Sequence, residues 1–228
     1  MANYPRYAIY YTSAQGSALD RFGASLLGYD AYGGGELPFP DGLPSDWRDL
    51  TQDPRKYGFH ATLKAPFSLA EGRTASELHD CAADLATRRQ PFSFNLSVGA
   101  ISGFLALVPV RPAAALVELG AACVERFERF RAPESRKEIE RRRAAGLSAC
   151  QEALLARWGY PYVLDEFRFH MTLSERLDEP ERGRIKALLQ DMFGPVLEAP
   201  VTIDSISIFE QPEGGAPFVE TARYPLGG

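Results

Sequence analysis

The residues best suited to chemistry stand in two copies of one short pattern, a histidine followed two positions later by a threonine. The copies read GFHATL at residues 58–63 and RFHMTL at residues 168–173, and they agree at four of six positions. Their histidines, His60 and His170, are 110 residues apart. An imidazole has an ordinary pKa of about 6.5, so it can take or give a proton near neutral pH. Two imidazoles on opposite sides of one phosphorus atom could act as general base and general acid in a displacement that uses no metal.

Alternation along a strand predicts which residues lie beside each histidine. We expect strands over residues 57–64 and 167–174, and successive side chains of a strand point to opposite faces. Thr62 and Thr172 share the histidine faces, where their hydroxyls can donate to phosphoryl oxygens. Lys64 and Arg168 fall on the same faces and are candidate phosphate contacts, with a solvated charge at a strand end as the alternative. The opposite faces are apolar and are expected to face the core, through Phe59, Ala61, Leu63, Phe169, Met171 and Leu173.

The elements that must position these residues repeat in the same order in the two halves of the chain. Each half reads strand, helix, strand, helix, strand, which predicts a duplicated α+β unit. No linker of flexible composition separates the halves, so we expect a single domain over residues 1–228, with lobes of about 1–102 and 103–228. The expected strands are residues 7–12, 57–64, 92–98, 103–109, 167–174, 201–209 and 218–224, and the expected helices are residues 17–27, 75–88, 112–130, 148–158 and 180–193.

Two segments fall outside this pattern. Residues 33–53 are rich in glycine and proline and are expected to form a long loop, which could border a site. Residues 131–146 carry a nearly balanced run of charges and are expected to be an exposed helix and loop. The second segment is either a solvated surface or a lid whose arginines reach an anionic substrate.

Composition limits the class of partner and the compartment. The chain has 25 basic and 30 acidic side chains, a net charge of −5, which does not suit a long DNA or RNA duplex. Three cysteines without a CxxC pair predict neither a disulfide framework nor a zinc site, and they favour a reducing compartment. The first residues lack the pattern of a signal peptide, and the apolar stretches are too short to span a bilayer. We therefore expect a cytoplasmic protein that does not enter a membrane.

The two histidine motifs resemble those of the 2H phosphoesterase superfamily, which is named for its paired H-x-T/S-x motifs. In this chain they read HATL at residues 60–63 and HMTL at residues 170–173. The longer stretches at residues 55–64, 158–162 and 167–170 look like the branch encoded alongside phosphonate-degradation genes.

The resemblance implies an α+β fold in which two antiparallel sheets flank a central cleft, with helices on the outside. It also implies phosphodiester hydrolysis without a metal or cofactor, often on a cyclic phosphate of ribose. His60 and His170 would be the catalytic pair, and Thr62 and Thr172 the donors to the phosphate oxygens. Which histidine is base and which is acid stays open. The implied partner is a small phosphorylated substrate, for the phosphonate-linked branch a ribose cyclic phosphate or a related sugar phosphate.

Other functions use the same residues. The first is an RNA end-processing phosphodiesterase that holds a short 2′,3′-cyclic end in the cleft. The second is a protein that binds a phosphorylated ligand without catalysis, although phosphate binding needs cations more than neutral imidazoles. A metal site at His60 and His170 has no support from ligand spacing, because the chain shows no HxH, HxxxH or clustered carboxylates.

Overall fold

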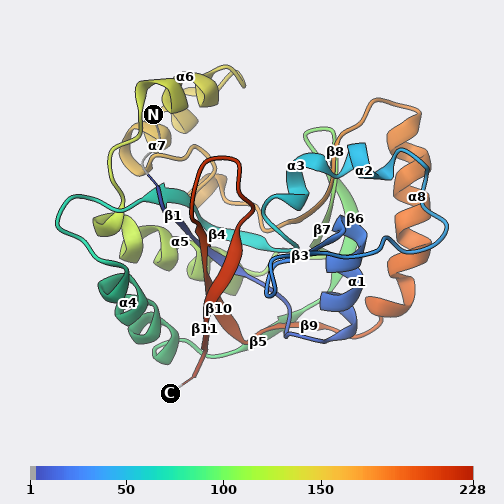
Figure 1. The fold of residues 1–228 in the computed structure, drawn as a ribbon, viewed down its shortest axis with the longest axis horizontal. Helices are drawn as coiled ribbons and strands as arrows, with labels where there is room; N and C mark the ends of the chain where they lie inside the picture. The colour runs from blue at the N-terminus through green and yellow to red at the C-terminus, as the bar shows by residue number, and fades with distance from the viewer. Residues whose placement is uncertain (1–3, 228) are drawn as a thin grey trace.

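A seven-stranded antiparallel sheet runs through the middle of the protein (Figure 1). The structure is a computed structural model that describes residues 4–227. The strand order is β11-β10-β1-β4-β8-β7-β6. These strands are β1 (Arg6–Tyr11), β4 (Ala61–Ser68), β6 (Leu96–Ile101), β7 (Phe104–Pro109), β8 (Met171–Arg176), β10 (Ser205–Gln211) and β11 (Val219–Pro225). Two small sheets pair β2 (Tyr29–Asp30) with β3 (Gly35–Glu36), and β5 (Phe92–Phe94) with β9 (Val201–Ile203).

The large sheet consists of two antiparallel halves that meet at one residue pair. Strands β4 and β8 pair only through Ala61 and Met171. One half contains β11, β10, β1 and β4, and the other contains β8, β7 and β6. The expected lobes, residues 1–102 and 103–228, do not correspond to these half-sheets. Because β10 pairs with β1, and β6 with β7, each half-sheet contains strands from both expected lobes.

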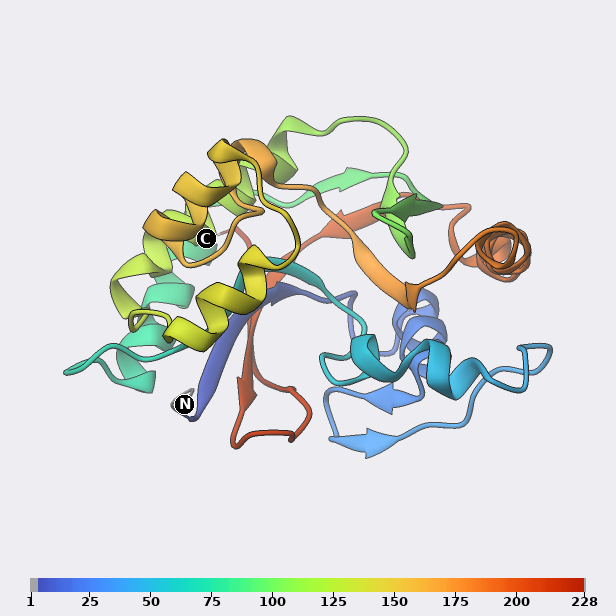
Figure 2. The same ribbon diagram turned by 90° about the horizontal axis from the view of Figure 1, so that it is seen from above.

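Helices lie in two groups on either side of the central strands. Figures 1 and 2 show α4, α5, α6 and α7 together on one side, and α1, α2, α3 and α8 on the other. The expected α+β class, with antiparallel sheets and outer helices, is confirmed. The helices are α1 (Ala18–Leu27), α2 (Trp47–Leu50), α3 (Gln52–Arg55), α4 (Ala75–Thr87), α5 (Ala114–Phe127), α6 (Arg136–Arg143), α7 (Ala149–Trp158) and α8 (Glu181–Phe193), with short 3₁₀ turns η1 (Glu128–Phe130), η2 (Leu164–Glu166) and η3 (Gly194–Val196). No helix within residues 4–227 has the length and apolar character needed to cross a membrane.

Local capping explains why the helix boundaries agree with the sequence. Ser17 caps α1 by accepting a hydrogen bond from the Asp20 amide, and Gly28 ends that helix in the left-handed conformation with a φ of 69°. Ser148 forms a capping box at the start of α7, and Gly159 ends it with a φ of 70°. These signals lie in the sequence beside the helix, so they need no tertiary information.

Three expected segments differ from the structure. Residues 92–98 and 201–209 were each expected to be one strand, but each divides into two strands that belong to different sheets. The expected loop at residues 33–53 contains β3, α2 and the start of α3. Trp47 anchors this segment, because its side chain is buried and its Nε1 donates to the Leu26 carbonyl at 2.7 Å. Tertiary packing thus orders a segment whose composition is typical of a loop.

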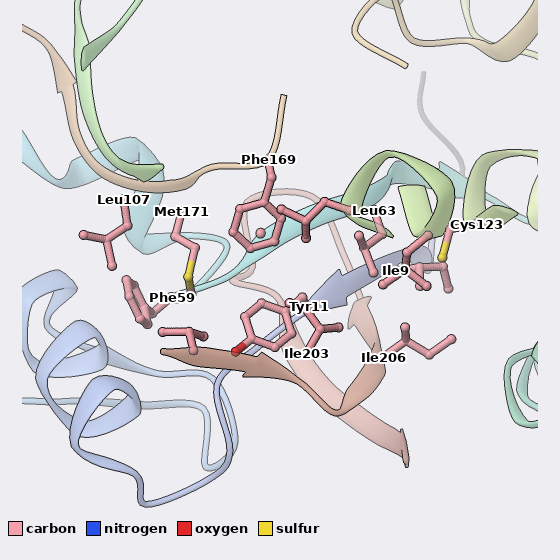
Figure 3. Packing of buried hydrophobic residues seen from close by; sticks show 14 of the residues in the cluster. Ile9, Tyr11, Phe59, Leu63, Leu107, Cys123, Phe169, Met171, Ile203 and Ile206 are labelled. Carbon is pink, nitrogen blue, oxygen red and sulfur yellow. The ribbon is translucent and has the colours of Figure 1, made fainter. Parts of the chain in front are cut away.

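One hydrophobic core lies beneath both half-sheets, against α1, α4, α5 and α8. All six residues expected on the core faces are buried, as predicted. Figure 3 shows Phe59 and Met171 from the two motifs packed into the same cluster, close to Phe169. With these side chains fixed in the core, the residues between them must point to the opposite face of the sheet. The core therefore determines the direction of the motif histidines and threonines.

Candidate active site

The four motif residues lie where the two half-sheets meet. His60 directly precedes β4 and His170 directly precedes β8, so each strand begins later than the sequence predicts. The antiparallel pairing of Ala61 with Met171 places His60 opposite Thr172, and Thr62 opposite His170. Opposite side chains in such a register are about 5 Å apart at Cβ, and diagonal ones about 7–8 Å. All four residues line one cleft of about 420 Å³.

Both imidazoles are held in the same way. Nδ1 of His60 lies 2.9 Å from the carbonyl oxygen of Gly58, and Nδ1 of His170 lies 2.7 Å from that of Arg168. A carbonyl oxygen can only accept, so each Nδ1 must carry the proton and each Nε2 must present its lone pair. In His60 that lone pair accepts a hydrogen bond from the Thr62 hydroxyl at 3.2 Å. Two equivalent bases are therefore fixed in one tautomer.

Gly58 allows the first histidine to take this position. Its φ is 74°, and a Cβ added to it would come within 2.7 Å of the Ala31 Cβ. Both the backbone conformation and the close approach require glycine. The carbonyl that orients His60 therefore depends on a residue without a side chain.

Both histidines pack against aromatic rings and have lowered pKa values. The rings of Tyr10 and His60 have centroids 3.8 Å apart, and Phe104 lies 5.5 Å from His170. Burial lowers the pKa of His60 to about 4, and the nearby His170 lowers it further in the same direction. Burial also lowers the pKa of His170. Both imidazoles are consequently neutral at pH 7, which suits proton transfer better than permanent charge.

Arginines give the cleft a positive charge although the chain as a whole is acidic. Arg6, Arg141, Arg142 and Arg176 line it, and Glu138 is the one acidic side chain among its described lining residues. The charged segment at residues 131–146 thus forms part of the cleft wall through α6. An anionic ligand would be attracted here by charges that the net value of −5 conceals.

Lys64 does not reach the cleft. Its side chain is only 3% exposed, and its Nζ lies 2.5 Å from Oε2 of Glu128 and 3.1 Å from the Val124 carbonyl. The pairing of β1 with β4 shifts register between Thr62 and Lys64, where Tyr10 pairs with the former and Ile9 with the latter. This irregularity breaks the alternation and turns the lysine towards α5. The prediction that Lys64 lies on the histidine face is therefore wrong.

Arg168 lies beside the cleft and not in its lining. It is exposed and lines an adjoining pocket of about 280 Å³. That pocket shares Thr62 and His170 with the cleft. The carbonyl of Arg168 orients His170, so its backbone is already part of the site.

The donor set does not match a metal centre. Within residues 4–227, no group of three or more histidine, cysteine, aspartate or glutamate side chains comes together. The two cleft histidines lie beside hydroxyls and arginines, which favour an anionic ligand over a cation.

A comparison with models of protein families shows the family to which the chain belongs. The family described as "Protein of unknown function (DUF1045)" matches residues 62–219, a stretch that begins at Thr62 and contains the whole second motif. The chain belongs to this family.

Two curated relatives extend beyond this DUF1045 chain. One is a ribose 1,5-bisphosphate phosphokinase PhnN from Janthinobacterium sp. (strain Marseille), 39% identical over 98% of the chain and 51% of the relative. The other is a protein of the same name from Laribacter hongkongensis (strain HLHK9), 36% identical over 93% of the chain and 50% of the relative. The chain thus spans about half the length of both.

Solved structures with a similar arrangement include E. coli LigT complexed with 3′-AMP, at 14% identity and a TM-score of 0.45, covering 98% of this chain and 99% of LigT. Another is a protein described as a phosphoesterase, at 14% identity and a TM-score of 0.43, covering 99% of this chain and all of the other.

Several cleft residues of this DUF1045 protein escape prediction from the sequence. Arg176 is the last residue of β8 and lines the cleft. It is an even number of residues from His170, but the strand expected from the sequence ends two residues before it. Arg6 and Tyr10 share one face of β1, but a short strand with apolar residues on both sides does not reveal which face meets the site. Arg142 belongs to the charged segment at residues 131–146, for which the sequence leaves open a solvated surface or a lid whose arginines reach an anionic substrate, and it lines the cleft.

Proposed function

We propose that this protein hydrolyses a small cyclic phosphate or phosphodiester, with a cyclic phosphate of ribose as the preferred substrate class. The observation that carries the proposal is the pair of imidazoles in one cleft, each with Nδ1 on a backbone carbonyl, which leaves Nε2 as the atom that exchanges a proton. In His60 this Nε2 accepts a hydrogen bond from the Thr62 hydroxyl, which a ligand would have to displace. A binding protein would need the cations but not this matched pair of bases.

In the proposed reaction, one imidazole removes a proton from water through Nε2. The water oxygen attacks phosphorus as the bond to the leaving sugar oxygen breaks on the opposite side. The other histidine, protonated at Nε2, delivers its proton to that oxygen, and the product is a phosphate monoester with a free hydroxyl. Water supplies the oxygen and both protons are accounted for, so no further reactant is needed.

The hydroxyls and cations have a separate role. Thr62 and Thr172 lie opposite the two histidines and can donate to the non-bridging oxygens, where charge increases in the transition state. Arg176 lies in the same cleft. These groups bind the phosphate, and the histidines move the protons.

We expect the pH dependence of kcat/KM to be bell-shaped, with its maximum below pH 6.5. The base must be unprotonated, so activity is lost as pH falls through the lower pKa of the pair, and the acid must be protonated, so activity is lost as pH rises through the higher one. The pKa of His60 is about 4 and that of His170 lies below its ordinary value of 6.5. Initial rates on one cyclic phosphate between about pH 3 and about pH 9 would measure the profile, a range that extends at least about one unit beyond each limb. Two limbs above pH 7 would contradict the lowered pKa values of the two histidines.

The small size of the cleft favours a sugar phosphate over RNA. A volume of about 420 Å³ accommodates a small ligand. The curated relatives are named for ribose 1,5-bisphosphate, a phosphorylated ribose, which supports the same substrate class. An RNA end-processing enzyme remains the second candidate, because a short cyclic end would meet the same four residues.

Phosphorus NMR of the purified protein with candidate cyclic phosphates would test the proposal. We expect the resonance of a ribose cyclic phosphate to be replaced by that of a monoester, in the presence of EDTA and faster than for an oligonucleotide with a 2′,3′-cyclic end. Faster turnover of the oligonucleotide would favour the RNA alternative. A ligand that binds and is recovered unchanged would leave only the binding function.

A further inference from the structure

We propose that the cleft contains a second anion subsite, formed by Arg142 and Arg141 of α6 together with Arg6, which binds a phosphate monoester elsewhere on the substrate. The inference rests on the proposed function for the cyclic phosphate at the histidines. It defines the substrate as a sugar that carries two phosphoryl groups.

Arg142 is a largely buried cation in the wall of the cleft. Its side chain is 11% exposed, its guanidinium lies over the Tyr160 ring at 4.8 Å, and its Nη2 is 3.2 Å from Oε1 of Glu138. Its Nε is buried and has no hydrogen-bond partner among the described residues. A buried N–H without a partner destabilises the folded protein, and an anionic ligand oxygen would satisfy it. The same side chain lines the cleft that contains both histidines.

The protein neutralises the cations of this group only in part. Glu138 is shared by Arg141, at 2.5 Å, and Arg142, so one carboxylate faces two guanidinium groups. Arg6 bonds to the neutral amide oxygen of Gln211 at 2.8 and 2.5 Å. Within residues 4–227 it forms no salt bridge, and Glu134 and Glu138 act on it only through longer-range electrostatic interactions. The remaining positive charge matches a phosphate monoester, which carries about −1.5 to −2 at pH 7. Arginine also offers the planar pair of donors that phosphate oxygens accept.

The arginines of α6 fall into two groups, because Arg141 and Arg142 line the cleft whereas Arg136 and Arg143 do not. Arg143 pairs with Glu152 at 2.9 Å, is more than half exposed, and does not line the cleft. Arg136 is also exposed and lies 3.9 Å from Glu140. Neither of these arginines lines the cleft, and this position, not exposure, separates them from Arg141, which is itself 67% exposed. Arg141 and Arg142, on the same helix, face the site.

Calorimetric titration with ribose 5-phosphate tests the subsite without relying on turnover. We expect Arg142→Gln to weaken binding about 10- to 100-fold, because it removes charge-assisted hydrogen bonds. Arg141→Gln should weaken binding less, and since Arg141 is mostly exposed this variant guards against a folding defect. Arg143→Gln is the matched control, for which the dissociation constant should equal that of the wild type. Circular dichroism would check that each variant is folded.

A kinetic comparison then links the subsite to the substrate. The ratio of kcat/KM for a ribose cyclic phosphate with and without a 5-phosphate should exceed about 10 in the wild type and in Arg143→Gln, and fall towards 1 in Arg142→Gln. Ribose 5-phosphate that fails to bind the wild type, or binds folded Arg142→Gln equally well, overturns the subsite. Binding that depends on Arg142, with no hydrolysis of any cyclic phosphate, supports the subsite and instead refutes the proposed hydrolysis.

Discussion

Alanine at either His60 or His170 should lower kcat/KM for a cyclic phosphate by about 10²- to 10⁴-fold, the usual contribution of a positioned acid or base. Each imidazole is oriented by its own backbone carbonyl, so the loss of one leaves the other in place. The binding of a phosphate ligand should change much less than the rate, because the arginines and hydroxyls that line the cleft stay in place in these variants. Initial rates and the affinity for inorganic phosphate, both measured with EDTA present, would separate the two effects.

His79 provides the matched control for these variants. It lies in α4, and its Nδ1 is 2.6 Å from the Tyr224 hydroxyl, outside the cleft. His79→Ala should retain wild-type kcat/KM. A folded His60→Ala protein with wild-type kcat/KM would contradict the acid–base role, and so would an equal loss of activity in His79→Ala.

Glu128→Ala should lower the free energy of unfolding by about 3–5 kcal/mol, the typical cost of removing one partner from a buried ion pair. The change leaves the ammonium group of Lys64, only 3% exposed, with the Val124 carbonyl as its remaining partner. It also removes the carboxylate that Arg131 contacts at 2.6 Å. Equilibrium denaturation in urea would measure the loss.

Two controls define the role of Lys64 more closely. Replacing both partners, as in Lys64→Met with Glu128→Leu, should recover part of the stability, because the buried ammonium group of Lys64 is removed together with its carboxylate. The recovery is incomplete because Arg131, 12% exposed, still loses its contact with Glu128. Glu36→Ala breaks an exposed pair with Arg48 and should change stability little. If Lys64→Met folds but hydrolyses cyclic phosphate far more slowly than the wild type, the lysine contacts substrate and its structural assignment is wrong.

Patterns that depend on neighbours in the chain predict much of this fold. The repeated motif predicts which side chains enter the core, since Phe59 and Met171 are buried and the histidines between the apolar residues line the cleft. Ser17 and Gly28 predict the ends of α1 for the same local reason. The alternation of apolar residues in a strand and the capping of a helix depend on a few neighbouring residues, so they can be recognised without knowledge of tertiary contacts.

Contacts between distant segments are the part that the sequence does not predict. The register shift that turns Lys64 away from the cleft arises from its pairing with β1, more than fifty residues earlier in the chain. The pairing of β1 with β10 joins strands from the two expected lobes in one half-sheet, and no pattern in the sequence predicts this pairing. Arg142 enters the site because α6 packs beside the histidine face, and its charge-rich sequence alone is equally typical of a solvated helix.

The most direct test of the account is kcat/KM for a ribose cyclic phosphate in the wild type, the two single histidine variants and the double variant. Because both imidazoles act in one displacement at one phosphorus atom, removing the second should cost little once the first is gone. We predict that the double variant is about as slow as the slower single variant. Losses that multiply across the two sites, or a double variant with wild-type activity, would contradict the paired role of His60 and His170.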